Sequence, residues 1–384
     1  MNTLDRYIAK SYLVNVLALL VILYALILAT DYSLNFDEYI RQAAERDVAG
    51  GASFLRRATL SLMLLINLWW PRLFQYYNYL LGMVLIGGMG FTLGQMVRHR
   101  EIVACLAGGI GLHRIARPIL IVAAGFVVLQ GVNREFVVPR LAELLTREKW
   151  DAGTSGIRAE SLPLTEDAAG RCYYAKAFDA GSGEMSGVWI RERDEKGLPT
   201  RKISAAMATY DAQAEGWRLT EGLAEVREGD SVRFEPVEFV KTELNPTTLK
   251  VRRFSSYGNN LSTMELSQLI EKTEAEVDAR PDGERRVAEG RLLDRLVRLR
   301  VARWTILACT MLAIVVCLPF FLRKIPGDML ARSVMCAPVA LAAVLGSTLL
   351  STAAIPGLPP TLSALIPALI LLPLAIAAIS SIRS

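Results

Sequence analysis

Histidine is almost absent from this sequence, and cysteine is sparse. The 384 residues include two histidines, His99 and His113, which flank one short segment. Of the five cysteines, Cys172 alone lies outside the apolar stretches, so no disulfide can form within the polar part of the chain. No CxxC pair is present either. A histidine-based catalytic centre or a zinc site therefore has almost no ligands available, and we expect no catalytic residues, metal or cofactor in this chain.

Asp, Glu, Lys and Arg are missing from four stretches, residues 13–29, 119–129, 304–322 and 361–380, whereas residues 140–303 are dense in charges of both signs. A chain that is 52% hydrophobic and 21% charged must occupy two environments. No charged residue falls in the middle of an apolar stretch. The sequence therefore disfavours a proton relay or an ion-coupled transporter, which would need such residues within the membrane.

Six apolar stretches are long enough to cross a bilayer, which takes roughly 20 helical residues. The expected spans are 11–30, about 76–96, about 115–132, 304–322, 333–354 and 361–380. Residues 54–96 are too many for one span, so we expect an interfacial helix to end at Trp69-Trp70, before Pro71, ahead of the second span. Pro118 is expected in the first turn of the third span, where proline is tolerated.

Basic residues near the short loops predict the orientation. They form four groups: Arg6 and Lys10; Arg98, Arg100, Arg114 and Arg117; Arg323, Lys324 and Arg332; and Arg383. With six spans all four groups fall on one side, which makes both termini cytoplasmic and places the polar insert on the other side. Anionic lipid headgroups account for the net charge of +5, so no nucleic-acid partner is expected.

The polar insert between the third and fourth spans reads as short strands separated by Gly- and Asp-rich turns. The expected strands are 172–178, 186–193, 202–210, 217–219, 232–240 and 247–254, and their alternation favours an antiparallel sandwich or half-open roll. Ser262 and Glu265 have the spacing of a capping box, which predicts a helical hairpin over 264–303 with a break near 281–283. The fold class is therefore α+β, six transmembrane helices with an inserted antiparallel β-domain.

The segment between the second and third spans, 98–117, contains a short helical stretch that starts at Glu101 and is closed by Gly108-Gly109. One interpretation is a connector that lies on the membrane surface. The other is a coupling helix, which seats in a groove on a cytosolic partner and transmits its motion. No Lys-Ser or Lys-Thr follows the glycines, so nucleotide binding is excluded here, and any ATP must be bound by another polypeptide.

Several short motifs, in this order and spacing, resemble a known family. They are Leu4–Ile8 before the first span, Glu101–Ala104 followed by Gly108, Asn133–Arg140 after the third span, Gly216–Leu219 in the insert, and Leu358–Pro360 before the last span. Together with the three-plus-three arrangement of spans, they are similar to the lipopolysaccharide-export permeases LptF and LptG.

The resemblance implies a bacterial inner-membrane location, a periplasmic β-jellyroll domain and a role as permease subunit of an ABC-type exporter for lipopolysaccharide or a related glycolipid. The implied partners are a cytosolic ABC ATPase dimer, a related sister permease and a periplasmic bridge protein. It also implies coupling to the ATPase and a lateral gate between the first and fifth spans. The candidate coupling residues are Glu101, Ile102, Ala104 and Gly108, and our own placement of the gate uses Asn15, Tyr24, Ser347, Thr348 and Ser351.

The expected domains are 1–132, with the coupling helix near 98–111; 133–262, the β-domain; 263–303, a helical connector; and 304–384. One departure concerns the outer end of the first span, which carries Asp31, where basic residues would better receive the phosphates of lipopolysaccharide. An alternative function is a membrane-anchored envelope scaffold whose β-domain binds a periplasmic protein. A membrane-embedded hydrolase is disfavoured, because the spans hold no Ser/His/Asp or paired-carboxylate arrangement.

Overall fold

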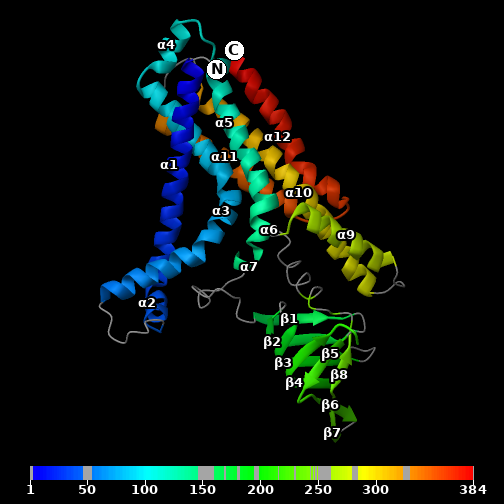
Figure 1. Cartoon of the computed structure of the whole chain (residues 1–384). Helices are drawn as coiled ribbons and strands as arrows, with labels where there is room; N and C mark the ends of the chain where they lie inside the picture. The colour runs from blue at the N-terminus through cyan, green and yellow to red at the C-terminus, as the bar shows by residue number, and fades with distance from the viewer. Residues whose placement is uncertain are drawn as a thin grey trace. The chain divides into compact units, whose positions relative to one another are not determined.

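The computed structural model describes residues 3–45, 54–145, 160–167, 170–179, 182–193, 199–214, 216–228, 231–242, 244, 246, 249, 261–278, 284–322 and 329–383. The chain divides into two compact units. One comprises residues 1–145 and 261–384, and the other comprises residues 146–260. The first is helical and the second holds the β-sheet (Figure 1).

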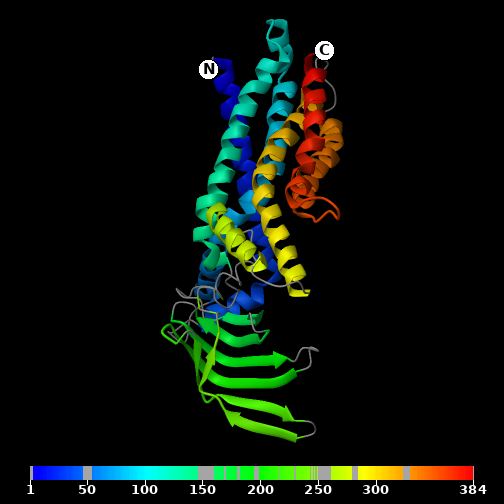
Figure 2. The ribbon, with the colours of Figure 1, turned by 90° about the vertical axis from the view of Figure 1, so that its right-hand side faces the viewer.

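The helical unit contains long helices and several short connecting ones (Figures 1 and 2). They are α1 (Thr3–Leu34), α2 (Phe36–Glu45), α3 (Phe54–Arg98), α4 (Glu101–Ala107), α5 (Leu112–Val132), the π-helix η1 (Asn133–Val137), α6 (Val138–Arg140), α7 (Ala142–Leu145), α9 (Thr263–Asp278), α10 (Glu284–Phe321), α11 (Met329–Thr352) and α12 (Pro360–Arg383). Six of the described helical stretches are long and apolar enough to cross a membrane, which confirms the predicted spans. The two termini and α4 lie at one end of this unit, and α2 lies at the other (Figure 1).

Three helix boundaries differ from expectation. The separate interfacial helix before Pro71 was a wrong prediction, because α3 is one continuous helix of 45 residues through that proline. Proline removes one backbone hydrogen bond and can bend a helix without ending it, and α3 changes direction along its length (Figure 1). Pro118 lies in the second turn of α5, which begins at Leu112. The fourth span continues the preceding connector helix, so α10 starts at Glu284. The expected turns at 281–283 and 323–328 lie outside the described residues.

The core of the helical unit lies along α3, α5 and α10. α1 contributes a stripe of Ile8, Tyr12 and Val16, spaced four residues apart and fully buried. α10 contacts α3, α5, α9, α11 and α12. Few residues of α1 are buried: 6% of its membrane-spanning window, the smallest share among the six spans. Most of the apolar surface of α1 is therefore free to contact lipid or another protein.

Among its described residues, the second unit forms an eight-stranded antiparallel sheet, which confirms the predicted fold class. Its strands are β1 (Glu160–Glu166), β2 (Cys172–Asp179), β3 (Glu184–Arg193), β4 (Pro199–Asp211), β5 (Gly216–Thr220), β6 (Leu223–Glu228), β7 (Ser231–Pro236) and β8 (Phe239–Lys241). The order is β1-β2-β3-β4-β5-β8, and β6 pairs with β4 and β7.

Four of the expected strands match β2, β3, β4 and β5. The strand expected at 232–240 is two strands, because β7 pairs with β6 while β8 pairs with β5. β1 and β6 were not predicted. The strand expected at 247–254 falls mostly outside the described residues.

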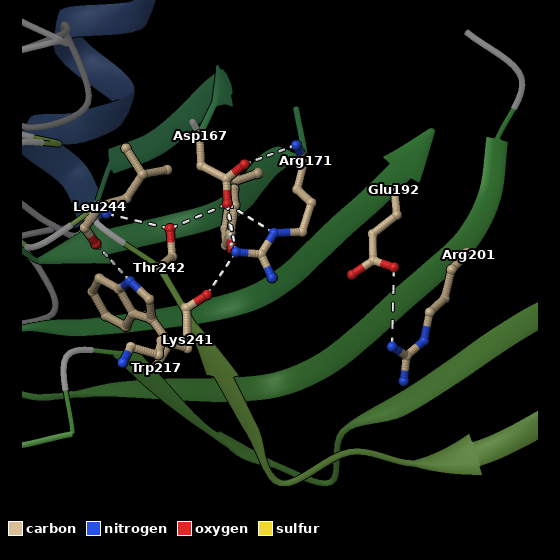
Figure 3. A network of polar contacts seen from close by, with 9 residues as sticks. Asp167, Arg171, Glu192, Arg201, Trp217, Lys241, Thr242 and Leu244 are labelled. Atoms are coloured by element: carbon tan, nitrogen blue, oxygen red, sulfur yellow. Dashed lines mark hydrogen bonds and ion pairs between the residues drawn. The ribbon is translucent and has the colours of Figure 1, made fainter. Parts of the chain in front are cut away.

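Trp217 organises the core of this sheet. Its ring is 1% exposed and packs edge-on against Phe178 and Tyr210. Its indole Nε1 donates to the backbone oxygen of Leu244 at 2.8 Å (Figure 3). A buried indole needs such a partner, and the bond ties the chain after β8 to β5.

Asp167 is the centre of a second buried contact, between β1 and β2 (Figure 3). Its carboxylate accepts hydrogen bonds from the backbone nitrogen and the guanidinium of Arg171 and from the hydroxyls of Tyr173 and Thr242. Arg171 Nη2 also donates to the backbone oxygen of Lys241 at 2.6 Å. Burial raises the pKa of Tyr173, so its phenol stays protonated and remains a donor. One carboxylate thus joins β1, β2 and the end of β8.

We predict that Asp167→Ala lowers the local unfolding free energy of β1, β2 and β8 by about 2–4 kcal/mol, because it removes the buried carboxylate that Arg171 and the hydroxyls of Tyr173 and Thr242 share. Hydrogen exchange of the full chain, followed by mass spectrometry, measures this. Glu192→Ala is the control, since it removes a 3.9 Å ion pair with Arg201 at the sheet surface (Figure 3) and should cost at most about 1 kcal/mol. Equal losses in both variants would contradict the central role of Asp167.

Candidate functional site

The predicted coupling segment is a short helix, α4, held between two sharp turns. Arg100 precedes it with φ 59°, in the left-handed region. At the other end Gly109 has φ 76°, its backbone nitrogen donates to the oxygen of Leu106, and the nitrogen of Ile110 donates to the oxygen of Cys105. These are the two bonds of a Schellman motif, which ends a helix and favours glycine. The glycine pair therefore stops α4, as the sequence predicted.

The four predicted coupling residues divide into two roles. Ile102 is 2% exposed and belongs to the core of the spans, so it anchors α4 to them. Ala104 and Gly108 are exposed, and Glu101 is partly exposed. The carboxylate of Glu101 accepts a hydrogen bond at 3.0 Å from the hydroxyl of Tyr7, near the start of α1. α4 is thereby linked to α1 as well as to α3 and α5.

Two of the predicted gate residues are bound to α3. The amide of Asn15 donates to the hydroxyl of Thr92 at 2.9 Å, and the hydroxyl of Tyr24 donates to the backbone oxygen of Leu73 at 2.9 Å. Tyr12 does the same to the oxygen of Leu85 at 3.0 Å. The polar groups of α1 therefore hold this helix against α3.

Close approach of α1 and α3 depends on glycine at position 88. A Cβ added to Gly88 would lie 2.7 Å from Cγ2 of Val16 and 3.4 Å from its Cα. Small residues allow helices to approach in a membrane, where packing drives association. The hydrogen bond between Asn15 and Thr92 forms beside this contact.

The remaining predicted gate residues lie on α11. Ser347 is 4% exposed and Ser351 is fully buried, whereas Thr348 is partly exposed. The hydroxyls of Ser347 and Thr348 bond to the backbone oxygen of Val344 in their own helix. α11 packs on α3, α10 and α12, while α1 packs on α3 and α5. The two sets of predicted gate residues thus share α3 as a neighbour and do not form one cluster within the described residues.

The acidic end of α1 is built into the fold. Asp31 Oδ2 accepts hydrogen bonds from the hydroxyl of Tyr39 at 2.7 Å and from the indole of Trp69 at 2.8 Å, and Asn35 donates to its Oδ1. The guanidinium of Arg72 lies 5.7 Å from the centre of the Trp69 ring. Burial, followed by the hydrogen bond to Asp31, raises the pKa of Tyr39. Asp31 therefore joins α1, α2 and α3.

A second polar cluster fixes the start of α9 to the spans. Glu135 in η1 accepts hydrogen bonds from the backbone nitrogen of Thr263 at 2.9 Å and from its hydroxyl at 2.6 Å. Arg303, whose side chain is 4% exposed, donates to the same hydroxyl and to the backbone oxygen of Leu261. A carboxylate at a helix N-terminus is favourable. The predicted capping box between Ser262 and Glu265 forms beside it and is confirmed.

The sequence interpretation missed most of these partners. Tyr7 was quoted only as part of a motif, and Thr92, Glu135 and Arg303 were given no role in the site. Glu135 and Thr263 are separated by 128 positions, so no local spacing could connect them.

Six apolar helices and an inserted antiparallel sheet define a multi-pass membrane protein. A family model of the lipopolysaccharide export system permease LptF/LptG matches residues 6–381, and this chain belongs to that family. The comparison with curated proteins found no match. At the level of the family, the chain is an inner-membrane permease of lipopolysaccharide export.

We predict that Gly88→Leu destabilises the helical unit by about 1–3 kcal/mol, because the new side chain overlaps Val16 and separates α1 from α3. Unfolding of the detergent-solubilised chain by increasing SDS measures the effect. Gly125→Leu is the matched control, since no described atom outside its own helix lies within 4 Å of the added Cβ. An unchanged Gly88→Leu unfolding curve would show that the two helices do not approach as described.

We also expect Glu135→Ala to increase hydrogen exchange at the first turn of α9, since it leaves Arg303 buried with less compensation. The local cost should be about 2–4 kcal/mol. Glu271→Ala, at an exposed position of the same helix, should change the free energy of local opening measured by exchange by less than about 0.5 kcal/mol. Protection of α9 that survives Glu135→Ala would rule out this attachment.

Proposed function

We propose that this chain is one of two permease halves of an ABC-type exporter that extracts lipopolysaccharide from the inner membrane and passes it to a periplasmic bridge protein. The proposal rests on α4. This helix is short and stopped at both ends, presents Glu101 and Ala104 at its surface, and is anchored by Ile102 in the core of the spans. Such a helix suits a groove on a cytosolic ATPase dimer, whose motion it would transmit.

The arrangement of α1 and α11 supports the need for a sister permease. Both helices contact α3, and each carries large apolar side chains at its surface, such as Val21 on α1 and Leu349 on α11. A lateral gate between a first and a fifth span is then best formed by helices of two different permeases. The gate residues Asn15, Tyr24, Ser347, Thr348 and Ser351 would support its two walls from within each permease.

The orientation follows from the basic loops and is part of the proposal. Both termini and α4 lie on the cytoplasmic side, and the sheet unit lies in the periplasm. This chain performs no covalent chemistry and carries no cofactor, because ATP is hydrolysed in the partner subunits. The apolar side chains of the sheet would receive the acyl chains of the lipid.

Reconstitution tests the proposal. The chain, purified from its native membrane, should bring down an ATPase and a second permease, and in vesicles it should release lipopolysaccharide to a soluble acceptor when ATP is added. Glu101→Arg should reduce ATP-dependent release at least about tenfold while ATP hydrolysis continues, because it reverses the charge at the expected contact.

Tyr7→Phe is the control for this experiment. It removes the internal hydrogen bond to Glu101 and leaves the charge of the contact intact. A loss of release in Tyr7→Phe equal to that in Glu101→Arg would indicate that Glu101 acts through α1 and not on a partner. A functional chain that purifies without any nucleotide-binding partner would instead favour the envelope scaffold.

A further inference from the structure

Arg298 of α10 is buried without a carboxylate beside it. The residue is 9% exposed, and its Nε donates to the hydroxyl of Ser363 in α12 at 3.2 Å. Within the part of the chain that the structure describes, this is its one hydrogen bond, and it forms no ion pair. Arg303, in the same helix, lies 4.0 Å from a carboxylate oxygen of Glu135. Because a buried charge without a counter-charge is strongly unfavourable, an anion beside Arg298 would stabilise the structure.

The guanidinium of Arg298 lies against the positive end of a helix. Ser363 is fully buried in the first turn of α12, and its backbone nitrogen donates to the oxygen of Pro359. The N–H groups of Thr361 and Leu362 precede this first helical bond, so they have no acceptor within α12. The first turn also holds no acidic residue. A helix N-terminus attracts anions and disfavours a cation, so the helix adds to the uncompensated charge of the arginine.

This cluster lies at the depth where a bilayer exposes its phosphate groups. α12 begins at the end of the spans opposite the two chain termini (Figures 1 and 2). Trp304, which is 66% exposed, lies about 9 Å further along α10 than Arg298 at 1.5 Å per residue. Exposed indoles favour the boundary between hydrocarbon and headgroups, so Arg298 lies in the headgroup layer.

An exposed apolar stripe on α12 begins in the same turn. Its members follow at intervals of three and four residues, which places them on one face of the helix. They are Leu362, Leu365, Leu369, Leu372 and Ile376, all of them exposed. A ligand that combines an anionic group with apolar chains therefore fits this surface better than a free anion does.

We infer that Arg298 and the first turn of α12 bind the phosphate group of a glycerophospholipid, whose acyl chains lie along this stripe. The two Nη atoms of a guanidinium match two oxygens of a phosphate, and the N–H groups of Thr361 and Leu362 suit the same group. The phosphate supplies the negative charge that the buried arginine lacks. Such a lipid is a bound component that joins α10 to α12 and is not the transported lipid. The inference requires a membrane protein and does not depend on what is exported.

Hydrogen exchange at the first turn of α12 tests the site. The full chain with its co-purifying partners is kept in dodecyl maltoside, and exchange on the millisecond scale is read by mass spectrometry. We expect dioleoylphosphatidylglycerol to slow exchange of the Thr361 and Leu362 amides at least about fivefold, because both become donors to the phosphate. Dioleoylglycerol has the same chains without a phosphate, and inorganic phosphate has no chains. Each should change exchange less than about twofold.

Two substitutions assign this effect to the guanidinium. Arg298→Gln should raise the phosphatidylglycerol concentration needed for half of the slowing at least about tenfold, the size of one hydrogen bond to a charged group. Arg295→Gln is the matched control, since it removes the same charge from an exposed position of α10 and should change this concentration less than about twofold. Arg298→Lys keeps the charge and loses the planar fork. It should weaken binding about threefold or more, which keeps the test decisive should Arg298→Gln fail to fold.

Three results would overturn the inference. Equal weakening by Arg295→Gln and Arg298→Gln would indicate general attraction to a basic surface. Slowing by dioleoylglycerol or by inorganic phosphate alone would show that the chains or a free anion suffice. Half of the slowing at a lower concentration of lipid A than of phosphatidylglycerol would make the transported class of lipid the occupant. None of these measurements uses ATP, so ATP-dependent release stays a separate test of the proposed function.

Discussion

Lipid supplies no hydrogen bonds, and the helical unit is arranged around that constraint. α3 is the helix on which the polar groups of its neighbours converge. Tyr12 and Tyr24 of α1 bond to backbone oxygens of α3, and so do Gln130 of α5 and Asn133 of η1. In water such bonds would compete with solvent, whereas in hydrocarbon each polar side chain must find a protein partner. The positions of α1 and α5 against α3 are therefore set by polar contacts as well as by the apolar core.

Two contacts connect α4 to the spans. Ile102 is buried in the core of the spans, and Glu101 is bonded to Tyr7 at the start of α1. From there α1 is attached to α3 at Asn15 and Tyr24, along most of its length. A displacement of α4 thus acts on a pair of helices that are joined to each other. In the proposed function, these contacts would carry a movement of α4 into both helices, because packed helices move as bodies.

Much of the fold could be predicted from the sequence, because its strongest signals are local. Long apolar runs identify the six spans, and alternation identifies β2 to β5. β1 was missed because Pro163 lies within it, and proline is found in edge strands, the position that β1 occupies. The division into β7 and β8 depends on which strands they pair with, and local pattern carries no such information.

Less of the candidate site could be predicted from the sequence. The start and stop of α4 could be predicted, because Glu101 and the glycine pair act locally. Which way the side chains of a span point could not be predicted, because an apolar helix surrounded by lipid has little amphipathic pattern. Asn15 and Tyr24 were therefore expected to line a gate, a role that stays a prediction, and the structure shows them bonded to α3.

The negative charge of Asp31 at the outer end of the first span is unfavourable for binding the phosphates of lipopolysaccharide. In the structure this carboxylate has a role in the fold. Asp31 is directed inward by Tyr39 and Trp69, which donate to one carboxylate oxygen. Glu38 is paired with Arg41 at 2.8 Å. The carboxylate of Asp31 is therefore directed at donors inside the helical unit, and the guanidinium of Arg72 lies over the same tryptophan ring. Asp31, the residue that argued against an anionic lipid, thus fixes α2 and α3 to α1, and its charge serves the fold.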